Sequence, residues 1–521
     1  MVAAAAVLLG LRVADLPLLD PDESRFARTS VEMARSGDLV VPTFQGVPRL
    51  VKPPLLHWIQ SALFRTFGAT PWIARLPACG ATLASLLFVA WIASRRFGGE
   101  SPAWSAAMFV TMPLVLAVGG LGTLDALLSV HVLAIVALDV VDPDGGDGQR
   151  ALAVGCLLGM CFLVKGPVGV VLPLLLMLAG RTASGRNVVP SVRNVALAAA
   201  GSLAVVAPWA AAVIQRAGAM PLLEILRRET LERYFAGADH VEPAWYLLAV
   251  TLVGLFPWAG VAAVAVVRAV LDRRDPATRT ARYLSAALLA GLVFFSLGRS
   301  KVATYVLPLA PLVATLAAWE LGRELAAPRR RVAGRTVLIV SLVATATSLL
   351  VRAPTLDPEV AVAARIGGLA LSAGAMVAVA GLVRERPRWT YGASVGAQVG
   401  LLVTVLLLVL PVIARQRTSA YLIEAVPVLR DPSRPLVVLA MKVPSLVYYL
   451  DRVPEEVDVE NLAGRLDRPD KPLIVADEVD LPSVVSIVRD RMGEIGRQGK
   501  YVVFEDRTPE QRPLDAPTPP G

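Results

Sequence analysis

Cysteine and charged residues are scarce in this sequence. Its three cysteines, Cys79, Cys156 and Cys161, lie in apolar stretches without metal-ligand spacing, so no disulfide framework and no cysteine-based metal site is predicted. Only 18% of the 521 residues are charged, whereas 55% are hydrophobic. A soluble chain of this length would carry far more surface charge, which excludes a large soluble protein.

Basic residues outnumber acidic ones, and the formal net charge is +9. They stand in short clusters between long apolar runs such as 195–214 and 395–413. Membrane topology explains basic clusters in these positions, so the charge does not predict nucleic acid as a partner. The apolar runs match the hydrocarbon thickness of a lipid bilayer, which is the partner that they do predict.

We predict an all-α polytopic membrane protein with about thirteen transmembrane helices. The predicted spans cover residues 1–14, 72–94, 102–119, 121–140, 150–164, 166–180, 194–214, 244–268, 283–298, 302–320, 336–351, 361–383 and 394–414. The first is shorter than the roughly 20 residues that a span requires, and it has neither a basic leader nor a cleavage site. We therefore hypothesise that the natural chain begins upstream of Met1, which mass spectrometry of the native N-terminus would test.

The basic clusters fall in alternate loops. Under the positive-inside rule these loops are cytoplasmic, so the first loop, 15–71, and the tail from Arg415 onward face outward. The clusters are Arg95 and Arg96; Arg181, Arg186 and Arg193; Arg273, Arg274, Arg279 and Arg282; Arg329, Arg330, Arg331 and Arg335; and Arg384, Arg386 and Arg388. This pattern predicts a cytoplasmic (inner) membrane protein whose C-terminal part lies on the outer side.

The tail differs in character from the rest of the chain. Two short apolar segments, Pro435–Ala440 and Pro472–Ala476, are typical of strands, and Leu481–Arg491 is typical of a helix. We predict a transmembrane part at 1–414, a small extracytoplasmic α/β domain at 415–507 and a Pro-rich disordered end at 508–521.

Polar residues that are unusual for a membrane protein gather on the outer side of this topology. They are Asp22, Glu23, Arg25 and Lys52 in the first loop, Asp125 and Lys165 at two outer turns, His240 in the loop 215–243, and Arg299, Lys301 and Tyr305 at the turn before the span that begins near residue 302. Ionisable groups at membrane depth usually line a cavity, because exposing them to lipid is costly. The set predicts an outward-facing polar cavity, although any single member also fits a structural or anchoring role.

Asp22 opens a predicted amphipathic helix of the first outer loop, which ends at Gly37. Aspartate is favoured at the N-cap of a helix, where it complements the helix dipole. A carboxylate held in a loop is also suited to act as a general base. The two roles are compatible, so Asp22 is a candidate for both.

Lys52 stands before Pro53 and Pro54 at the entry of a second predicted helix, whose apolar face suits the membrane surface. The unpaired amides of a helix start, together with a lysine, form a positive site that suits a phosphate. A lysine beside a membrane is also commonly an anchor to the lipid surface. The neighbouring prolines and loop acid favour the phosphate site.

Several segments resemble the signatures of a known family. The first outer loop of the bacterial aminoarabinose transferases is similar to Pro21-Asp22-Glu23-Ser24-Arg25-Phe26-Ala27, Met33-Ala34-Arg35-Ser36-Gly37-Asp38 and Lys52-Pro53-Pro54-Leu55. Two later signatures are similar to Leu163–Gly169 and Lys301–Pro308. The segments keep their order over residues 15–320, so the chain resembles the protein-mannosyltransferase-like group of C-type (GT-C) membrane glycosyltransferases.

The resemblance implies that a sugar moves from an undecaprenyl-type phosphate to an envelope acceptor, which is lipid A or another glycolipid, a cell-wall glycan or a protein. It implies that Asp22 is the catalytic base or orients the acceptor, and that Lys52 contacts the donor phosphate. Arg299 and Lys301 are further candidates for the donor phosphate. The expected substrate cavity also includes Glu23, Arg25, Asp125, Lys165, His240 and Tyr305.

One position departs from the aminoarabinose enzymes. In those enzymes a glutamate precedes the Lys-Pro-Pro segment and is implicated, with an outer-loop histidine, in binding zinc. This chain has Val51 there, so His240 lacks an acidic partner and we predict no metal, with a divalent ion left as the alternative. The same change weakens the expectation of aminoarabinose and lipid A as substrates.

Two other functions stay open. A lipid or sugar transporter or flippase would also have many spans, but transporters often contain internal repeats with broken helices in matching positions, and this sequence has no visible repeat. An inactive assembly subunit of the same family would not need Asp22 and Lys52, which are both retained.

Overall fold

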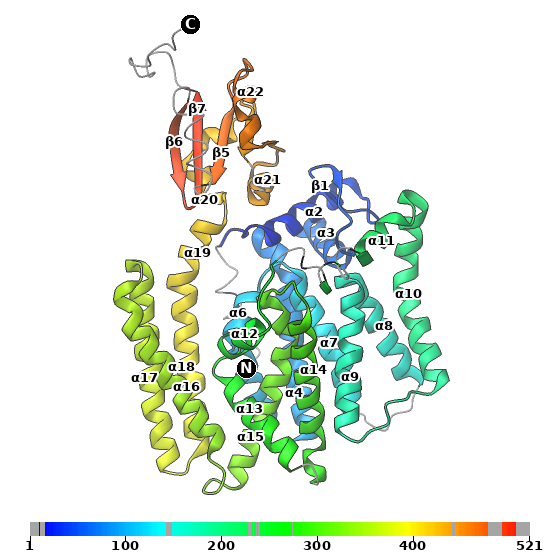
Figure 1. Cartoon of the computed structure of the whole chain (residues 1–521), viewed down its shortest axis with the longest axis vertical. Helices are drawn as coiled ribbons and strands as arrows, with labels where there is room; N and C mark the ends of the chain where they lie inside the picture. Colours follow the sequence, from blue (N-terminus) through cyan, green and yellow to red (C-terminus); the bar gives the residue numbers. More distant parts are fainter. Residues whose placement is uncertain are drawn as a thin grey trace.

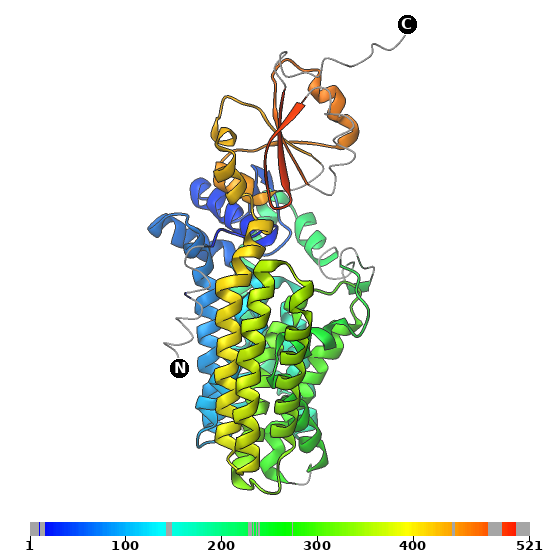
Figure 2. The same ribbon diagram turned by 90° about the vertical axis from the view of Figure 1, so that its left-hand side faces the viewer.

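The computed structural model describes residues 10, 16–141, 148–227, 232, 234, 235, 237, 240–272, 275–439, 443–477 and 492–506. A bundle of long helices forms the body of the molecule, and a region of strands and short helices lies on one end of it (Figures 1 and 2). We call this end the upper end, as it stands in Figure 1.

Nine helices in the described part of the chain are long and apolar enough to cross a membrane. Each overlaps one of the predicted spans, because a run of about 20 apolar residues is the length that a bilayer requires. They are α4 (Pro71–Arg96), α7 (Leu124–Val141), α8 (Gly148–Lys165), α10 (Val192–Ala217), η2 (Pro276–Thr278) with α14 (Arg279–Leu297), η3 (Ala303–Leu309) with α15 (Ala310–Ala326), α16 (Ala333–Arg352) with η4 (Ala353–Thr355), α17 (Pro358–Val383), and α18 (Pro387–Thr404) with η5 (Val405–Val409) and α19 (Leu410–Arg417).

Two of the predicted spans are broken helices rather than continuous ones. In the place of 102–119, α5 (Ser101–Val110) and α6 (Pro113–Gly119) meet at 64°, and in the place of 244–268, α12 (Tyr246–Gly254) and α13 (Trp258–Leu271) meet at 112°. Each second helix starts at or directly after a proline, which lacks the amide hydrogen that a continuous helix needs.

The remaining two predicted spans have different outcomes. The span 166–180 corresponds to α9 (Pro167–Ala183), an apolar helix that is shorter than these nine. The span 1–14 lies, apart from Gly10, outside the described residues.

The first outer loop lies across the upper end of the bundle (Figure 1). It consists of α2 (Asp22–Ser36), a hairpin of β1 (Thr43–Phe44) and β2 (Val47–Pro48), and α3 (Leu55–Phe67). Both helices were predicted: α2 ends at Gly37 in the left-handed conformation, and α3 follows the two prolines. The carboxylate of Glu32 on α2 accepts hydrogen bonds from Thr43, Gln45 and Gly46, which fixes the hairpin onto the helix.

The strand region contains a five-stranded mixed sheet with the order β4-β3-β5-β7-β6. Its elements are α20 (Ala420–Ala425), β3 (Leu436–Leu439), α21 (Pro444–Leu450), β4 (Glu455–Val457), α22 (Leu462–Leu466), β5 (Leu473–Asp477), β6 (Met492–Gln498) and β7 (Tyr501–Asp506). Strands β3 and β5 match the two predicted segments and pair in parallel, whereas β4, β6 and β7 were not predicted. The predicted helix 481–491 and the tail 508–521 lie outside the described residues.

The bundle has a buried centre and a lipid-facing periphery. In the most apolar stretch of η3 and α15, 89% of the residues are buried inside the protein, compared with 17% in the corresponding stretch of α10. An apolar helix that leaves most of its surface uncovered needs hydrocarbon around it rather than water. The structure is therefore that of an integral membrane protein.

Candidate functional site

A cavity of about 720 Å³ lies between the first outer loop and the upper ends of the spans. This volume is typical of a pocket for a small organic ligand or a headgroup. Its walls come from the start of α2, the segment before α3, the turn before α7, the ends of α8 and α19, and the segment that opens η3. Eight residues singled out in the sequence line it: Asp22, Glu23, Arg25, Lys52, Asp125, Lys165, His240 and Tyr305.

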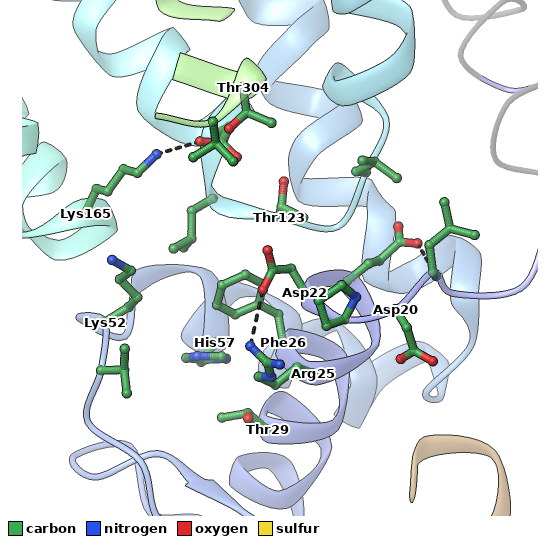
Figure 3. A pocket seen from close by; sticks show the side chains of 18 of the residues that line it. Asp20, Asp22, Arg25, Phe26, Thr29, Lys52, His57, Thr123, Lys165 and Thr304 are labelled. Carbon is green, nitrogen blue, oxygen red and sulfur yellow. Dashed lines mark hydrogen bonds and ion pairs between the residues drawn. The ribbon is translucent and has the colours of Figure 1, made fainter. Parts of the chain in front are cut away.

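Asp22 is the first residue of α2 and faces the cavity (Figure 3). The N-cap position belongs to Pro21, and no side chain caps the helix, so the expectation of Asp22 as N-cap is wrong. Its carboxylate is 65% exposed and lies 3.3 Å from the guanidinium of Arg25, one helical turn further on. An exposed carboxylate at this edge is accessible to a ligand.

Glu23, the next residue, has a structural role. Its carboxylate is buried and accepts hydrogen bonds from the Arg75 guanidinium (2.7 Å to each oxygen) and from the amides of Leu19 and Gly122 (2.9 Å each). Burial alone would raise the pKa of Glu23, but Arg75 and the two amides hold that pKa below its ordinary value. Glu23 thereby fixes the start of α2 to α4 and to the turn before α7, and leaves Asp22 facing the cavity.

Lys52 lines the cavity directly before the two buried prolines that open α3 (Figure 3). His57, in the first turn of α3, is buried behind it, and its Nδ1 lies 2.9 Å from the Ser30 hydroxyl of α2. Burial lowers the pKa of His57 to about 4, so the ring is neutral at neutral pH. The Ser30–His57 contact holds the helix that carries Asp22 against the helix that follows Lys52.

Three predicted cavity residues from distant parts of the chain meet on the side of the spans. The Lys165 ammonium at the end of α8 lies 2.6 Å from the Asp125 carboxylate in the first turn of α7. The same ammonium lies 4.8 Å from the centre of the Tyr305 ring in η3, a cation–π distance. Both charged side chains keep about 15% exposure toward the cavity, so they are partly desolvated but reachable.

Two predicted phosphate-binding residues have no place in the cavity wall among the described residues. The Lys301 side chain is buried, and its ammonium donates to the Glu242 carbonyl at 2.7 Å. Arg299 is exposed beyond the wall, and its amide donates to the carbonyl of Tyr234. The turn before η3 therefore points its cations away from the cavity and presents Thr304 and Tyr305 instead.

The described residues contain no group of three or more histidine, cysteine or acidic side chains that could hold a metal. Val51 lies in the cavity wall with no ligating atom, and His240 is exposed.

Other residues of the wall were not predicted. They are Asp20, Thr29, Arg49, His57, Thr123, Glu224, Thr304 and Arg417, together with apolar neighbours. Arg49 and His57 flank the Lys-Pro-Pro segment, and this position in the sequence could have identified them as residues of the cavity wall. Arg417 is the last residue of α19 and lies more than 300 residues after the Lys-Pro-Pro segment in sequence. Only the three-dimensional structure shows that it belongs to the cavity wall.

Comparisons with known proteins agree with this architecture. Residues 51–211 match the family model of dolichyl-phosphate-mannose-protein mannosyltransferases. An undecaprenyl phosphate-alpha-4-amino-4-deoxy-L-arabinose arabinosyl transferase of Aeromonas hydrophila is 32% identical over 310 residues, which cover 58% of this chain and 56% of the relative. The enzyme of the same name from Edwardsiella ictaluri is 29% identical over 366 residues, covering 65% of this chain and 62% of that enzyme. The chain thus spans less than two thirds of these relatives.

Solved structures extend the likeness to the whole chain. ArnT of Cupriavidus metallidurans, bound to undecaprenyl phosphate, superposes with a TM-score of 0.78 at 22% identity and covers 98% of both chains. The chain therefore has a GT-C-like fold, and part of its sequence is similar to the mannosyltransferase family model and to the arabinosyl transferases. An oligosaccharyltransferase of Archaeoglobus fulgidus shares the GT-C fold more distantly, with a TM-score of 0.50 at 11% identity and coverage of 99% of this chain and 74% of that one. In this GT-C chain, Asp22 and Lys52 lie on the first outer loop and the Asp125–Lys165 pair lies on the spans facing it.

Proposed function

We propose that the protein is a membrane glycosyltransferase that moves a sugar from a polyprenyl phosphate of the undecaprenyl type to an acceptor of the cell envelope. The observation that carries the proposal is the cavity at the upper end of the helix bundle. Asp22, Lys52 and Lys165 all line this one cavity. A polyprenyl phosphate keeps its chain in the bilayer and its phosphate at the membrane surface, which is the level of this cavity.

The donor phosphate is assigned to the positive side of the cavity. When the sugar leaves, the bond between its anomeric carbon and the phosphate oxygen breaks, and negative charge develops on the phosphate. Lys52 and Lys165 are placed to stabilise that charge in a partly dry cavity, where a charge–charge interaction is stronger than in water. The Asp125 carboxylate and the Tyr305 ring hold Lys165 in position.

Asp22 is assigned to the acceptor. A hydroxyl acceptor forms its new bond to the anomeric carbon while its proton passes to the Asp22 carboxylate. A phosphate acceptor already carries a negative oxygen, so Asp22 then orients it rather than removing a proton. The exposure of Asp22 supports both cases, since the carboxylate is accessible and its described partner is the single guanidinium of Arg25.

The membrane is assigned as the inner membrane, with the cavity and the strand region on its outer side. Helix α4 is 26 residues long; it starts beside the cavity, where Arg75 binds Glu23, and ends at Arg95 and Arg96. That is a rise of about 39 Å, enough to cross a bilayer. A basic far end fits the cytoplasmic face under the positive-inside rule.

The proposal is tested with the protein in lipid nanodiscs and a panel of radiolabelled polyprenyl-phosphate sugars mixed with envelope extracts. We expect one donor to lose its label to an acceptor, and unlabelled undecaprenyl phosphate to inhibit this transfer. Lys52→Met should weaken that inhibition at least about tenfold, whereas Lys471→Met, an exposed lysine of the strand region, should not. Undecaprenyl phosphate binding without consumption of any donor would favour lipid transport instead.

A further inference from the structure

The segment directly before Asp22 is held by residues from the other end of the chain. The amide of Leu18 donates to the Tyr449 hydroxyl at 2.7 Å, and the amide of Asp20 donates to the Arg417 carbonyl at 2.7 Å. Tyr449 lies in α21 of the strand region, and Arg417 is the last residue of α19. Leu18 and Asp20, which come shortly before Asp22, are therefore both positioned by partners from the C-terminal part of the chain.

The Asp20 carboxylate makes the most direct connection. It accepts hydrogen bonds from the Ser445 amide at 2.8 Å, from the Ser445 hydroxyl and from the Tyr501 hydroxyl at 3.1 Å, as well as from the Ser24 hydroxyl on α2. These described hydrogen-bond donors are all neutral, and burial raises the pKa of Asp20. A carboxylate with neutral donors is costly to bury, so a simple packing role would be served better by an apolar side chain.

A second contact holds the outer face of α2. Asp451, at the end of α21, binds the guanidinium groups of Arg28 and Arg35, the latter at 2.7 and 2.8 Å. Arg28 and Arg35 are seven residues apart, which places them two turns apart on one side of the helix. The strand region thus binds α2 both before its first turn and along its length.

The same C-terminal elements form part of the cavity wall. Ile413 and Arg417 of α19 line the cavity together with residues of the first outer loop. Ser419, two residues after Arg417, lies 2.8 Å from the Ser445 hydroxyl that contacts Asp20. The backbone from Arg417 to Ser419, followed by the hydrogen bonds of Ser445, therefore connects the cavity wall to Asp20.

We propose that Asp20 is a positioning residue that couples the seating of the strand region, through Ser445 and Tyr501, to the placement of Asp22 for sugar transfer. This inference rests on the proposed glycosyltransferase function. Donor phosphate binding depends on Lys52 and Lys165, which lie on other elements, so it is independent of this coupling.

The test uses the full-length protein in nanodiscs with the variants Asp20→Ala, Asp20→Asn, Ser445→Ala and Tyr501→Phe. Ser433→Ala is the matched control, because its hydroxyl donates to Asp431 on the exposed surface of the strand region, away from Asp20. Turnover, inhibition by undecaprenyl phosphate and hydrogen exchange of the amides of residues 18–25 are measured on the same samples. Asparagine keeps the shape of Asp20 and one acceptor oxygen, so it serves as the partial rescue of alanine.

We expect Asp20→Ala to lower kcat between about tenfold and 100-fold, because a small misplacement of a catalytic group has effects of that size. Asp20→Asn, Ser445→Ala and Tyr501→Phe should have smaller effects in the same direction. Inhibition by undecaprenyl phosphate should stay unchanged, and amides 18–25 should exchange faster. Variants that match Ser433→Ala in both kcat and exchange would overturn the coupling, as would a parallel loss of kcat and undecaprenyl phosphate binding.

The two proposals fail in distinguishable ways. If the wild-type protein transfers no sugar from any donor, the proposed function fails, while faster exchange in Asp20→Ala would still establish the contact between the strand region and the start of α2. If the wild type is active and none of the four variants changes kcat, the function stands and the positioning role of Asp20 is wrong.

Discussion

Both carboxylate oxygens of Glu23 accept hydrogen bonds from the guanidinium of Arg75, each at 2.7 Å. The two side chains are 2% and 0% exposed. This pair joins the first outer loop to α4, directly beside the exposed Asp22. Adjacent acids thus have different tasks: one fixes the backbone, and the other faces the cavity.

Glu23→Gln should destabilise the protein strongly. It leaves the Arg75 guanidinium buried without its counter-charge, and breaking a buried ion pair in this way costs about 3–5 kcal/mol. We expect a large loss of thermal stability in nanodiscs and low yields of folded protein. The control is Glu494→Gln, whose ion pair with Arg497 is about 40% exposed and should contribute little. Equal stability of the two variants would contradict a structural role for Glu23.

The Asp125–Lys165 pair gives a second prediction, which concerns coupling. Asp125→Asn and Lys165→Met should each lower stability by about 1–3 kcal/mol, because each removes one partner of a partly buried ion pair. The double variant should lose less than the sum of the two, as a double-mutant cycle would show. The Asp477–Lys500 pair of the strand region, at a similar 2.7 Å, is the control. Additive losses at Asp125 and Lys165 would mean that the two side chains act separately.

A third prediction concerns pH. Arg35 lowers the pKa of Asp451 to about 2 against its burial, and Arg28 adds to this effect. Because the folded-state pKa lies below the unfolded value near 3.8, the pair stabilises the protein fully above that value and loses its effect as pH falls toward 2. Solvent screening limits the contribution to about 1 kcal/mol or less. The stability difference between wild type and Asp451→Asn should be constant from pH 7 to 5 and shrink below pH 4; a difference that grows below pH 4 would contradict this assignment.

The orientation in the membrane is a fourth prediction. In a background without Cys79, Cys156 and Cys161, a membrane-impermeant maleimide should label Val453→Cys on intact cells. It should label Arg330→Cys, in the exposed basic turn between α15 and α16, only after the cells are permeabilised. The opposite pattern would place the cavity on the cytoplasmic side and remove the proposed route to an envelope acceptor.

Much of the architecture could be predicted from the sequence because a bilayer imposes one length on every apolar helix. The breaks at Pro113 and before Trp258 were missed, since a proline kinks some membrane helices and ends others, and neighbouring helices decide which. Strands β6 and β7 were missed because they pair with each other and with β5, and that pairing, rather than apolar composition alone, stabilises them.

The site was predictable to a similar degree. Lys52 was singled out because it precedes two prolines at the start of a predicted helix, and Asp125 and Lys165 because ionisable groups at membrane depth are rare. Lys301 has the same signal, but the Glu242 carbonyl turns its ammonium away from the cavity, and one sequence does not reveal that orientation. Asp20 was missed because its partners, Ser445 and Tyr501, lie more than 400 residues further along the chain.

In the proposed reaction, Asp22 activates or orients the acceptor that takes the sugar from the polyprenyl phosphate. The most direct measurement is the rate of sugar release from the active donor in nanodiscs, with the acceptor present, for wild type, Asp22→Asn and the control Glu424→Gln. Glu424 is an exposed acid of α20 outside the cavity. We predict that Asp22→Asn loses at least about 100-fold in kcat while undecaprenyl phosphate still inhibits with unchanged strength, and that Glu424→Gln matches wild type. Wild-type turnover in Asp22→Asn would contradict the account.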